Sequence, residues 1–253
     1  MEEKQEMRRE RGVSAAMLHV LAMGLMLCDH MWATLFPAAE WLTCLGRIAF
    51  PIFAFLLVEG YFHTGNLKRY LLRLLGWAVI SETPFNLMCF GSAFYPYHQN
   101  VLWTFLLSLL LITLLDRVRD RLKPALAVVA SAALIVLGYL LGFLLMVDYY
   151  GVGVLTVVVF YYFSQRRWWS YLGQLACLAF LNIELLGGLV YEVALFGYEL
   201  EISQQGLALL ALIPIWLYRG RQGEHRKPFR HFCYVFYPAH MLVLALIRGA
   251  HTA

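Results

Sequence analysis

The chain is poor in charged residues for its length. Asp, Glu, Lys and Arg make up 14% of its 253 residues, whereas soluble domains carry roughly 25%. It also lacks low-complexity stretches and clear internal repeats, and its polar connections are too short for a separate soluble domain. We therefore predict one integral-membrane domain over residues 1–253, with a cytoplasmic segment at 1–13 and a helical bundle at 14–248.

Cysteine is equally sparse, and its spacing excludes the common metal and redox motifs. The five cysteines form no CxxC motif and no Cys/His pattern typical of zinc sites, so no metal is expected. Cys44 and Cys89 both fall near the predicted outer face, which leaves a disulfide between them open.

Long apolar runs take the place of the missing charge. Hydrophobic residues make up 61% of the chain. Runs of roughly 18 to 25 apolar residues, the length that crosses a bilayer as a helix, recur along it. The sequence predicts an all-α, polytopic membrane protein with about nine spans in the lipid bilayer. The predicted spans are 14–36, 44–63, 68–90, 100–116, 124–147, 150–163, 168–190, 203–218 and 229–248. The sixth is short, and the seventh could extend towards Tyr198 and break at Gly187-Gly188, which leaves nine or ten spans open.

Lysine and arginine set the predicted orientation, because they collect in cytoplasmic connections. Of the 20 in the chain, all but Arg47 and Arg248 lie in the N-terminal segment or in and beside the even-numbered connections. We therefore expect a cytoplasmic N-terminus in an inner or plasma membrane, and no nucleic-acid partner. The apolar run after Ser14 is too long for the core of a signal peptide, so the first span is expected to be retained.

Several ionisable residues lie inside these apolar spans. Placing one charged side chain at bilayer depth costs roughly 2.5 to 3.5 kcal/mol on insertion scales, so such residues usually pair within the protein and mark a site. With a helical rise of about 1.5 Å per residue, the predicted topology gathers six polar residues in the outer half of the membrane. They are Asp29, His30, Arg47, Glu82, Asn86 and His240.

Asp29 and His30 need partners from other helices, because neighbours on one helix point about 100° apart. We expect Arg47 to pair with Asp29 or with Glu82, since an unpaired buried charge would be more costly. His30 would then be oriented by the remaining carboxylate, or by a hydroxyl or an amide. A neutral His30 in an apolar site is suited to act as a general base.

A second polar cluster is predicted at the inner ends of the second and third spans. Its members are Glu59, His63, Lys68, Tyr70 and Arg73. Cations at the cytosolic ends of helices can bind a phosphorylated ligand. They are equally what anchoring of the helices in the membrane produces by itself.

The residue types alone leave three functions open. The buried groups suit catalysis, a proton-coupled transporter or flippase, or ion pairs that only join helices. The sequence has no inverted repeat of the kind common in transporters, which mildly disfavours the second.

Five strings of the sequence resemble a known family. DHMWATLFP, GRIAFPIFAFLLVEGYFHT, LKRYLLRLLGWAVISETPFNL, QNVLWTF and FYPAHML are similar to the TraX family of integral membrane proteins. The similarity is densest over residues 24–105 and returns at 234–244, whereas the middle of the chain matches only in hydropathy.

The resemblance implies an acyltransferase. TraX is named for a protein that acetylates pilin, and the family resembles wider groups of membrane acyltransferases in which a buried histidine does the chemistry. It implies acetyl-CoA as the cytosolic acyl donor and an amine or hydroxyl acceptor on the other side of the membrane. His30 would be catalytic, Asp29, Arg47, Glu82 and His240 would support it, and the inner cluster would meet the nucleotide end of coenzyme A. Arg47 or Asn86 is expected to stabilise the oxyanion, and a homodimer is left open.

Overall fold

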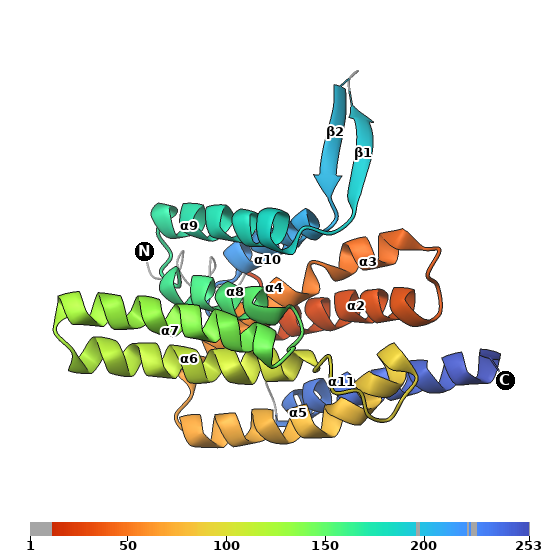
Figure 1. The fold of residues 1–253 in the computed structure, drawn as a ribbon, viewed down its shortest axis with the longest axis horizontal. Coiled ribbons are helices and arrows are strands. Elements are labelled where there is room, and N and C mark those ends of the chain that lie inside the picture. Colours follow the sequence, from red (N-terminus) through yellow and green to blue (C-terminus); the bar gives the residue numbers. More distant parts are fainter. Residues whose placement is uncertain (1–11, 196–197, 222, 224–226, 253) are drawn as a thin grey trace. The chain divides into compact units, whose positions relative to one another are not determined.

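The computed structural model describes residues 12–195, 198–221, 223 and 227–252 (Figure 1). Its elements in chain order are α2 (Ala15–Thr34), α3 (Glu40–Gly46), α4 (Ala49–His63), α5 (Leu67–Phe90), α6 (Val101–Arg121), α7 (Pro124–Leu144), α8 (Tyr150–Tyr162), α9 (Trp168–Ala179), the π-helix η1 (Phe180–Leu186), β1 (Val190–Leu195), β2 (Tyr198–Ser203), the 3-10 helix η2 (Gln205–Ala211), α10 (Leu212–Leu217) and α11 (Lys227–Thr252). They fall into two compact units, one of Met1–Leu56 with Gly187–Ala253 and one of Leu57–Leu186. A single membrane domain stays a prediction.

Six helices among the described residues are long and apolar enough to cross a membrane. They are Ala15–Thr34, Glu40–His63, Val101–Arg121, Pro124–Leu144, Trp168–Leu186 and Pro228–Ala250. Tyr150–Tyr162 and Gln205–Leu217 are apolar but shorter. The prediction of a helical, multi-pass membrane protein is thus confirmed. Nine spans and a cytoplasmic N-terminus stay predictions, and the first 11 residues, with four of the basic residues behind that orientation, lie outside the described part of the chain.

A β-hairpin separates two of the predicted spans. We predicted helix over 168–190 and 203–218, but the first helix ends at Leu186 and the second begins at Gln205. Gly187 and Gly188 have φ of +62° and +104°. Such backbone favours glycine and cannot continue a helix.

The hairpin itself has a clear register. β1 and β2 pair antiparallel, with Tyr191 opposite Ile202 and Glu192 opposite Glu201. Along β2, Glu199 and Glu201 alternate with apolar residues, which is typical of a strand and not of a span, whereas β1 carries one glutamate, Glu192. Hydropathy averaged over a window as long as a membrane span hides this period of two, so the hairpin was not predicted from the sequence.

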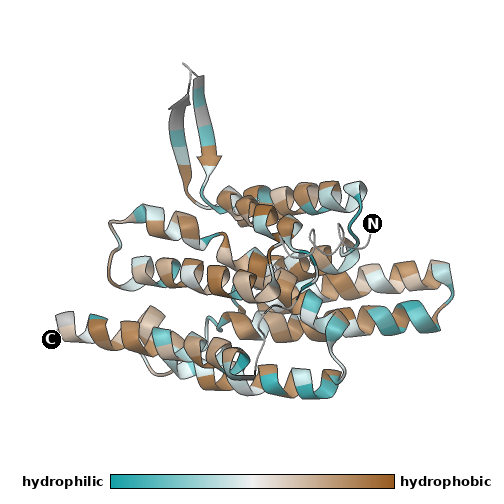
Figure 2. Ribbon diagram, turned by 180° about the vertical axis from the view of Figure 1, so that it is seen from behind, coloured by the Kyte–Doolittle hydropathy of each residue, from teal (hydrophilic) through white to brown (hydrophobic). Residues whose placement is uncertain are grey.

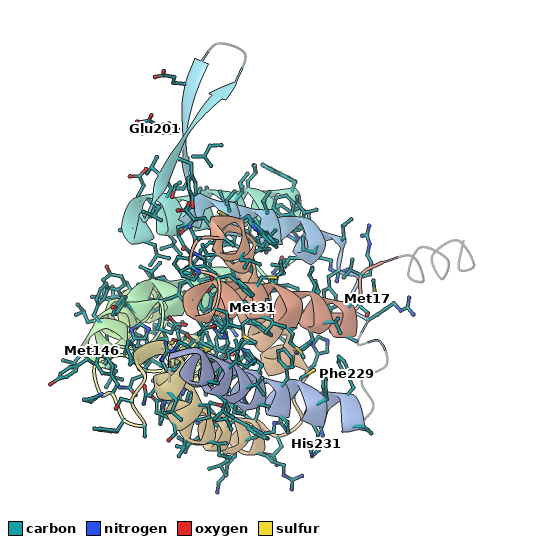
Figure 3. All side chains as sticks on the ribbon, turned by 90° about the vertical axis from the view of Figure 1, so that its right-hand side faces the viewer. Met17, Met31, Met146, Glu201, Phe229 and His231 are labelled. Atoms are coloured by element: carbon teal, nitrogen blue, oxygen red, sulfur yellow. The ribbon has the colours of Figure 1, made fainter. Side chains whose placement is uncertain are left out.

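In the first unit, α2 packs against both α3 and α11. Gly46 permits the close approach of α3, because a Cβ atom at that position would lie 2.3 Å from the Cβ of Asp29. Figure 1 shows the hairpin leading away from α2 and α3. Figure 3 shows Glu201 on the hairpin, far from Met17 and Met31 of α2.

In the second unit, α6 packs against α5, α7 and α8, and α8 packs against α9. The side chain of Phe160 on α8 is 1% exposed, as expected for a helix enclosed by others. Figure 2 shows apolar residues along these helices and hydrophilic residues gathered at the ends of α5 and α6. This distribution suits helices that cross an apolar layer between two aqueous faces.

A carboxylate ties three helices of this unit together. Asp116 on α6 accepts short hydrogen bonds from the hydroxyls of Tyr61 on α4 and Tyr161 on α8. Arg119 lies one turn further along α6 and donates to the same carboxylate. The sequence analysis did not single out this cluster, although an aspartate that ends a long apolar run was a signal for it.

Glycine decides how closely α7 and α8 approach. A Cβ atom at Gly142 would lie 2.6 Å from the Cα and 2.7 Å from the backbone nitrogen of Gly151. Backbone atoms cannot give way as a flexible side chain can, so a methyl group must separate the helices.

We therefore expect Gly142→Ala to lower the free energy of unfolding by about 1–3 kcal/mol. Gly76 in α5 is the matched control, because a Cβ atom there would meet nothing within 4 Å. Gly76→Ala should be neutral or stabilise the helix by up to about 1 kcal/mol. Thermal unfolding of the two variants in detergent measures the difference, and equal melting temperatures would contradict it.

Candidate functional site

Two histidines from different helices meet in the first unit. Nδ1 of His30 on α2 lies 2.7 Å from Nε2 of His240 on α11. Their ring centroids are 4.9 Å apart, and the ring of Phe236 stacks on His240 with a centroid distance of 4.7 Å. Both histidines were predicted to belong to the site. The expected partner of His30 was wrong, however: an imidazole orients it, where we predicted a carboxylate, a hydroxyl or an amide.

The hydrogen bonds around this pair fix its tautomers when both rings are neutral. Nδ1 of His240 lies 2.7 Å from the backbone oxygen of Phe236. A carbonyl only accepts, so this Nδ1 carries the hydrogen and Nε2 of His240 is an acceptor. Nδ1 of His30 must then donate to it, which leaves the lone pair of His30 on Nε2.

Nε2 is therefore the ring nitrogen of His30 that is available as a base in the candidate site. None of the described residues hydrogen-bonds to this Nε2, and the Thr34 hydroxyl donates to the backbone oxygen of His30 at 2.6 Å. A neutral imidazole that is oriented by a hydrogen bond at Nδ1 and keeps its lone pair on Nε2 is the arrangement that general-base and nucleophilic catalysis require.

An ion pair lies one residue before His30. Nη2 of Arg47 donates to Oδ1 of Asp29 at 2.8 Å, and the two side chains are 20% and 23% exposed. Of the two partners predicted for Arg47, the structure has Asp29. Thr43 joins them, because its hydroxyl donates to the same Oδ1 at 2.7 Å and accepts from Arg47 at 2.6 Å. The sequence analysis missed Thr43, although a hydroxyl four residues before an arginine on one helix was a usable signal.

A glutamine completes the surroundings of Arg47. Nη1 of Arg47 donates to Oε1 of Gln205 at 3.5 Å, and Gln205 is 7% exposed. The preceding residue, Gln204, donates to the hydroxyl of Tyr191 at the base of the hairpin at 2.9 Å. This chain of contacts links the hairpin to the ion pair. The sequence analysis missed both glutamines, and their position in an apolar stretch was the available signal.

Glu82 and Asn86 belong to α5 of the second unit. Oε2 of Glu82 accepts from Nδ2 of Asn100 at 2.5 Å and from Nε1 of Trp103 at 2.9 Å. Oε1 of Glu82 and Oδ1 of Asn86 are buried without a hydrogen-bond partner among the described residues. Their expected place beside the histidines stays a prediction.

The predicted inner cluster lies wholly in the second unit. Nδ1 of His63 is 2.8 Å from the backbone oxygen of Glu59. The Arg73 guanidinium lies 5.3 Å from the centre of the Tyr70 ring, and Lys68 is exposed. The first turn of α5 carries no acidic residue, so its cations add to the positive end of the helix dipole. This end of α5 is electrostatically suited to an anion.

Comparison with known proteins identifies the family. A family model described as TraX protein matches residues 14–248. The chain belongs to the TraX family. It is 31% identical over 251 residues to a Dichelobacter nodosus protein named "Probable fimbrial assembly protein FimC, serogroup H1", an alignment that covers 94% of this chain and 97% of that protein. No solved structure matches.

The TraX match spans every residue of both predicted clusters. Within the described residues, no group of three His, Cys, Asp or Glu side chains could hold a metal ion. None of the five cysteines takes part in a disulfide, including Cys44 and Cys89.

The first variant to test in this TraX protein is Arg47→Ala. It leaves the Asp29 carboxylate without its cation inside an apolar helix, and we expect a loss of roughly 2–4 kcal/mol of stability. Asp120→Asn is the control, because Asp120 is exposed and lies 3.7 Å from the exposed Arg119. Such surface pairs contribute less than about 1 kcal/mol. Melting temperatures in detergent compare the two, and an unchanged value for Arg47→Ala would show that the pair does not support the fold.

A second test concerns His98, in the connection before α6. Nε2 of His98 lies 3.4 Å from Oδ1 of Asp148. The hydrogen bond that the His98 ring donates to the Asp148 carboxylate raises the pKa of His98 above 6.5 and outweighs burial, with smaller contributions from the charges of Asp148 and Glu82. The charged form therefore stabilises the fold fully below pH 6.5, and this stabilisation is lost as the pH rises through the pKa of the folded state.

We accordingly expect the wild type to lose stability as the pH rises from 6.5 through the raised pKa of His98, and His98→Gln to lose less. Melting temperatures measured across that range check this. Asp148→Asn should flatten the profile in the same way, and parallel profiles for all three proteins would exclude the His98–Asp148 interaction as the cause.

Proposed function

We propose that this TraX protein is a membrane acyltransferase. It moves an acetyl or other acyl group from cytosolic acyl-CoA to an amine or hydroxyl at the extracytoplasmic side. The observation that carries the proposal is the His30–His240 contact, because it leaves a basic Nε2 on His30 with a second imidazole behind it.

The reaction needs a proton acceptor at the moment of attack. The nucleophilic nitrogen or oxygen of the acceptor forms a bond to the thioester carbon while Nε2 of His30 takes its proton. The carbon–sulfur bond then breaks, and the protonated His30 returns the proton to the leaving thiolate. A ping-pong variant, in which His30 first carries the acyl group on Nε2, uses the same atom.

His240 positions His30 and shares its positive charge. When His30 is protonated, its Nδ1–H points at Nε2 of His240, which can take that proton while Nδ1 of His240 still donates to Phe236. A charge spread over two stacked rings is less costly in an apolar site than one confined to a single ring. The Asp29–Arg47 pair fixes α2 at the neighbouring residue, and Arg47 or Asn86 would stabilise the oxyanion.

The proposed topology has nine spans, with the N-terminus cytoplasmic in an inner or plasma membrane. α5 and the two shorter apolar helices supply the further spans. The basic first turn of α5 then faces the cytosol and would meet the phosphates of acyl-CoA through the cluster of Glu59, His63, Lys68, Tyr70 and Arg73. The name of the FimC relative makes a fimbrial subunit the first acceptor to try.

The test is release of free thiol from acetyl-CoA by purified protein with an acceptor present. His30→Ala should lower the rate by about 100-fold or more, while acetyl-CoA still binds. His19→Ala is a matched control on the same helix, because Nδ1 of His19 bonds to the Ala15 backbone oxygen of its own helix. Full activity of His30→Ala would exclude this mechanism.

A transporter would behave differently in the same preparation. It would release no thiol, but reconstituted vesicles would show proton-coupled uptake that His30→Ala abolishes. That pair of results would replace the acyltransferase proposal.

A further inference from the structure

Buried polar atoms without hydrogen bonds gather on one stretch of α5. The described residues contain four buried side-chain atoms of this kind: Oγ of Ser81, Oε1 of Glu82, Oδ1 of Asn86 and Oγ of Ser170. Three of the four lie within six consecutive residues. Leaving a buried polar group unpaired costs about 1–3 kcal/mol, so a cluster of them calls for a physical reason.

Asn86 is the most extreme member of this group. The residue is 1% exposed. Its Oδ1 has no partner, and no described residue hydrogen-bonds to its Nδ2. The α5 helix does not use this amide either as a cap or as a link to another helix. A leucine of similar size would be less costly at this position if the amide had only a packing role.

Glu82 offers a second acceptor on the same face. It precedes Asn86 by four residues, so the two side chains are neighbours along α5, with Cβ atoms ~6 Å apart. Asn100 and Trp103 hold one carboxylate oxygen, Oε2, and so fix the other. The fixed Oε1 is buried and unpaired. Ser81 lies about 100° round the helix from Glu82 and does not share this face.

The helix is weakened between these two residues. Pro84 lies inside α5, and its missing N–H deprives the backbone oxygen four residues earlier of a donor. This turn can therefore open to a ligand at a lower cost than an intact turn.

The pattern of donors and acceptors specifies the ligand. Oε1 of Glu82 and Oδ1 of Asn86 require N–H or O–H donors, and Nδ2 of Asn86 requires an acceptor. The carboxylate disfavours a phosphate or another anion. A secondary amide supplies both an N–H and a C=O, and it is uncharged, so its burial is the least costly.

We propose that Asn86 and Glu82 bind a secondary amide group of a substrate. The choice of substrate rests on the proposed acyltransferase function. Two substrates of such an enzyme carry this group: the pantetheine arm of acyl-CoA, which has two secondary amides separated by a short carbon chain, and a peptide acceptor. The shared chemistry is the amide, and the source is decided by experiment.

The test replaces the ligand N–H by oxygen. S,N-diacetylcysteamine and its ester analogue S,O-diacetylmercaptoethanol are thioesters that differ only in this group. Their preference ratio is measured twice on the full chain in detergent: as concentration-dependent stabilisation against heat, which needs no turnover, and as thiol release. We expect the wild type to prefer the amide by roughly tenfold.

Variants assign that preference to the site. Asn86→Leu and Glu82→Gln should bring the ratio towards one, and Asn86→Asp serves if Asn86→Leu does not fold. Asn182→Leu is the matched control, because Asn182 is equally buried but donates to the Leu178 backbone oxygen. Without ligand, Asn86→Leu should melt at or above the wild-type temperature, whereas Asn182→Leu should melt below it.

The outcomes separate the two possible sources and the two proposals. A peptide acceptor and its depsipeptide analogue are compared in the same proteins. If the Asn86 and Glu82 variants lose the preference for the amide thioester over its ester analogue, the site binds an amide of pantetheine. If they lose the preference for the peptide over the depsipeptide, the site binds an amide of the acceptor. A wild type that prefers neither amide, or an Asn86→Leu protein that keeps the preference, overturns the amide site. Binding with the expected preference but without thiol release retains the amide site and rejects the acyltransferase.

Discussion

The first unit depends on one constraint: a charged side chain inside an apolar helix must find its partner within the protein. Asp29 finds it on α3, in Arg47 and Thr43, at 2.7–2.8 Å. The contact exists only because Gly46 has no side chain, since a Cβ atom there would overlap Asp29. A glycine, a hydroxyl and two charges therefore act together, and none of them can be changed without displacing α3 from α2.

This constraint also sets the orientation of the catalytic candidate. Fixing Asp29 towards α3 fixes the rotation of α2, and the next residue, His30, then points about 100° away, where His240 of α11 meets it. The backbone oxygen of Phe236 determines which nitrogen of His240 carries hydrogen, and through it which nitrogen of His30 is basic. The reactivity of one atom thus follows from a carbonyl on another helix. No motif in the sequence encodes that relation directly.

The sequence predicted which ionisable residues lie in the apolar helices, because that depends only on the residue types and the apolar runs around them. The cost of burying charge identified Asp29, Arg47 and the two histidines, and the strings around them identified the TraX family. The sequence could not give pairings that depend on helix rotation, so His30 was assigned the wrong kind of partner and Thr43 and Gln205 were missed. The hairpin was missed for a different reason: the period of two in β2, where Glu199 and Glu201 alternate with apolar residues, disappears when hydropathy is averaged over a long window.

Buried polar residues in this protein are of two kinds, and the difference separates structure from function. Asp29 and Asp116 accept hydrogen bonds from residues of other helices, and these bonds hold the helices together. Asn86 is more deeply buried than either aspartate, at 1% exposed, but its amide is bonded to nothing among the described residues. Folding alone would favour an apolar residue there. An unpaired amide lowers the stability of the free protein. Its presence has a physical reason if a ligand supplies the hydrogen bonds, because ligand binding then stabilises the folded protein. By this criterion the satisfied Asp29–Arg47 pair stabilises the first unit, whereas the amide of Asn86 in the second unit is a candidate contact for a ligand.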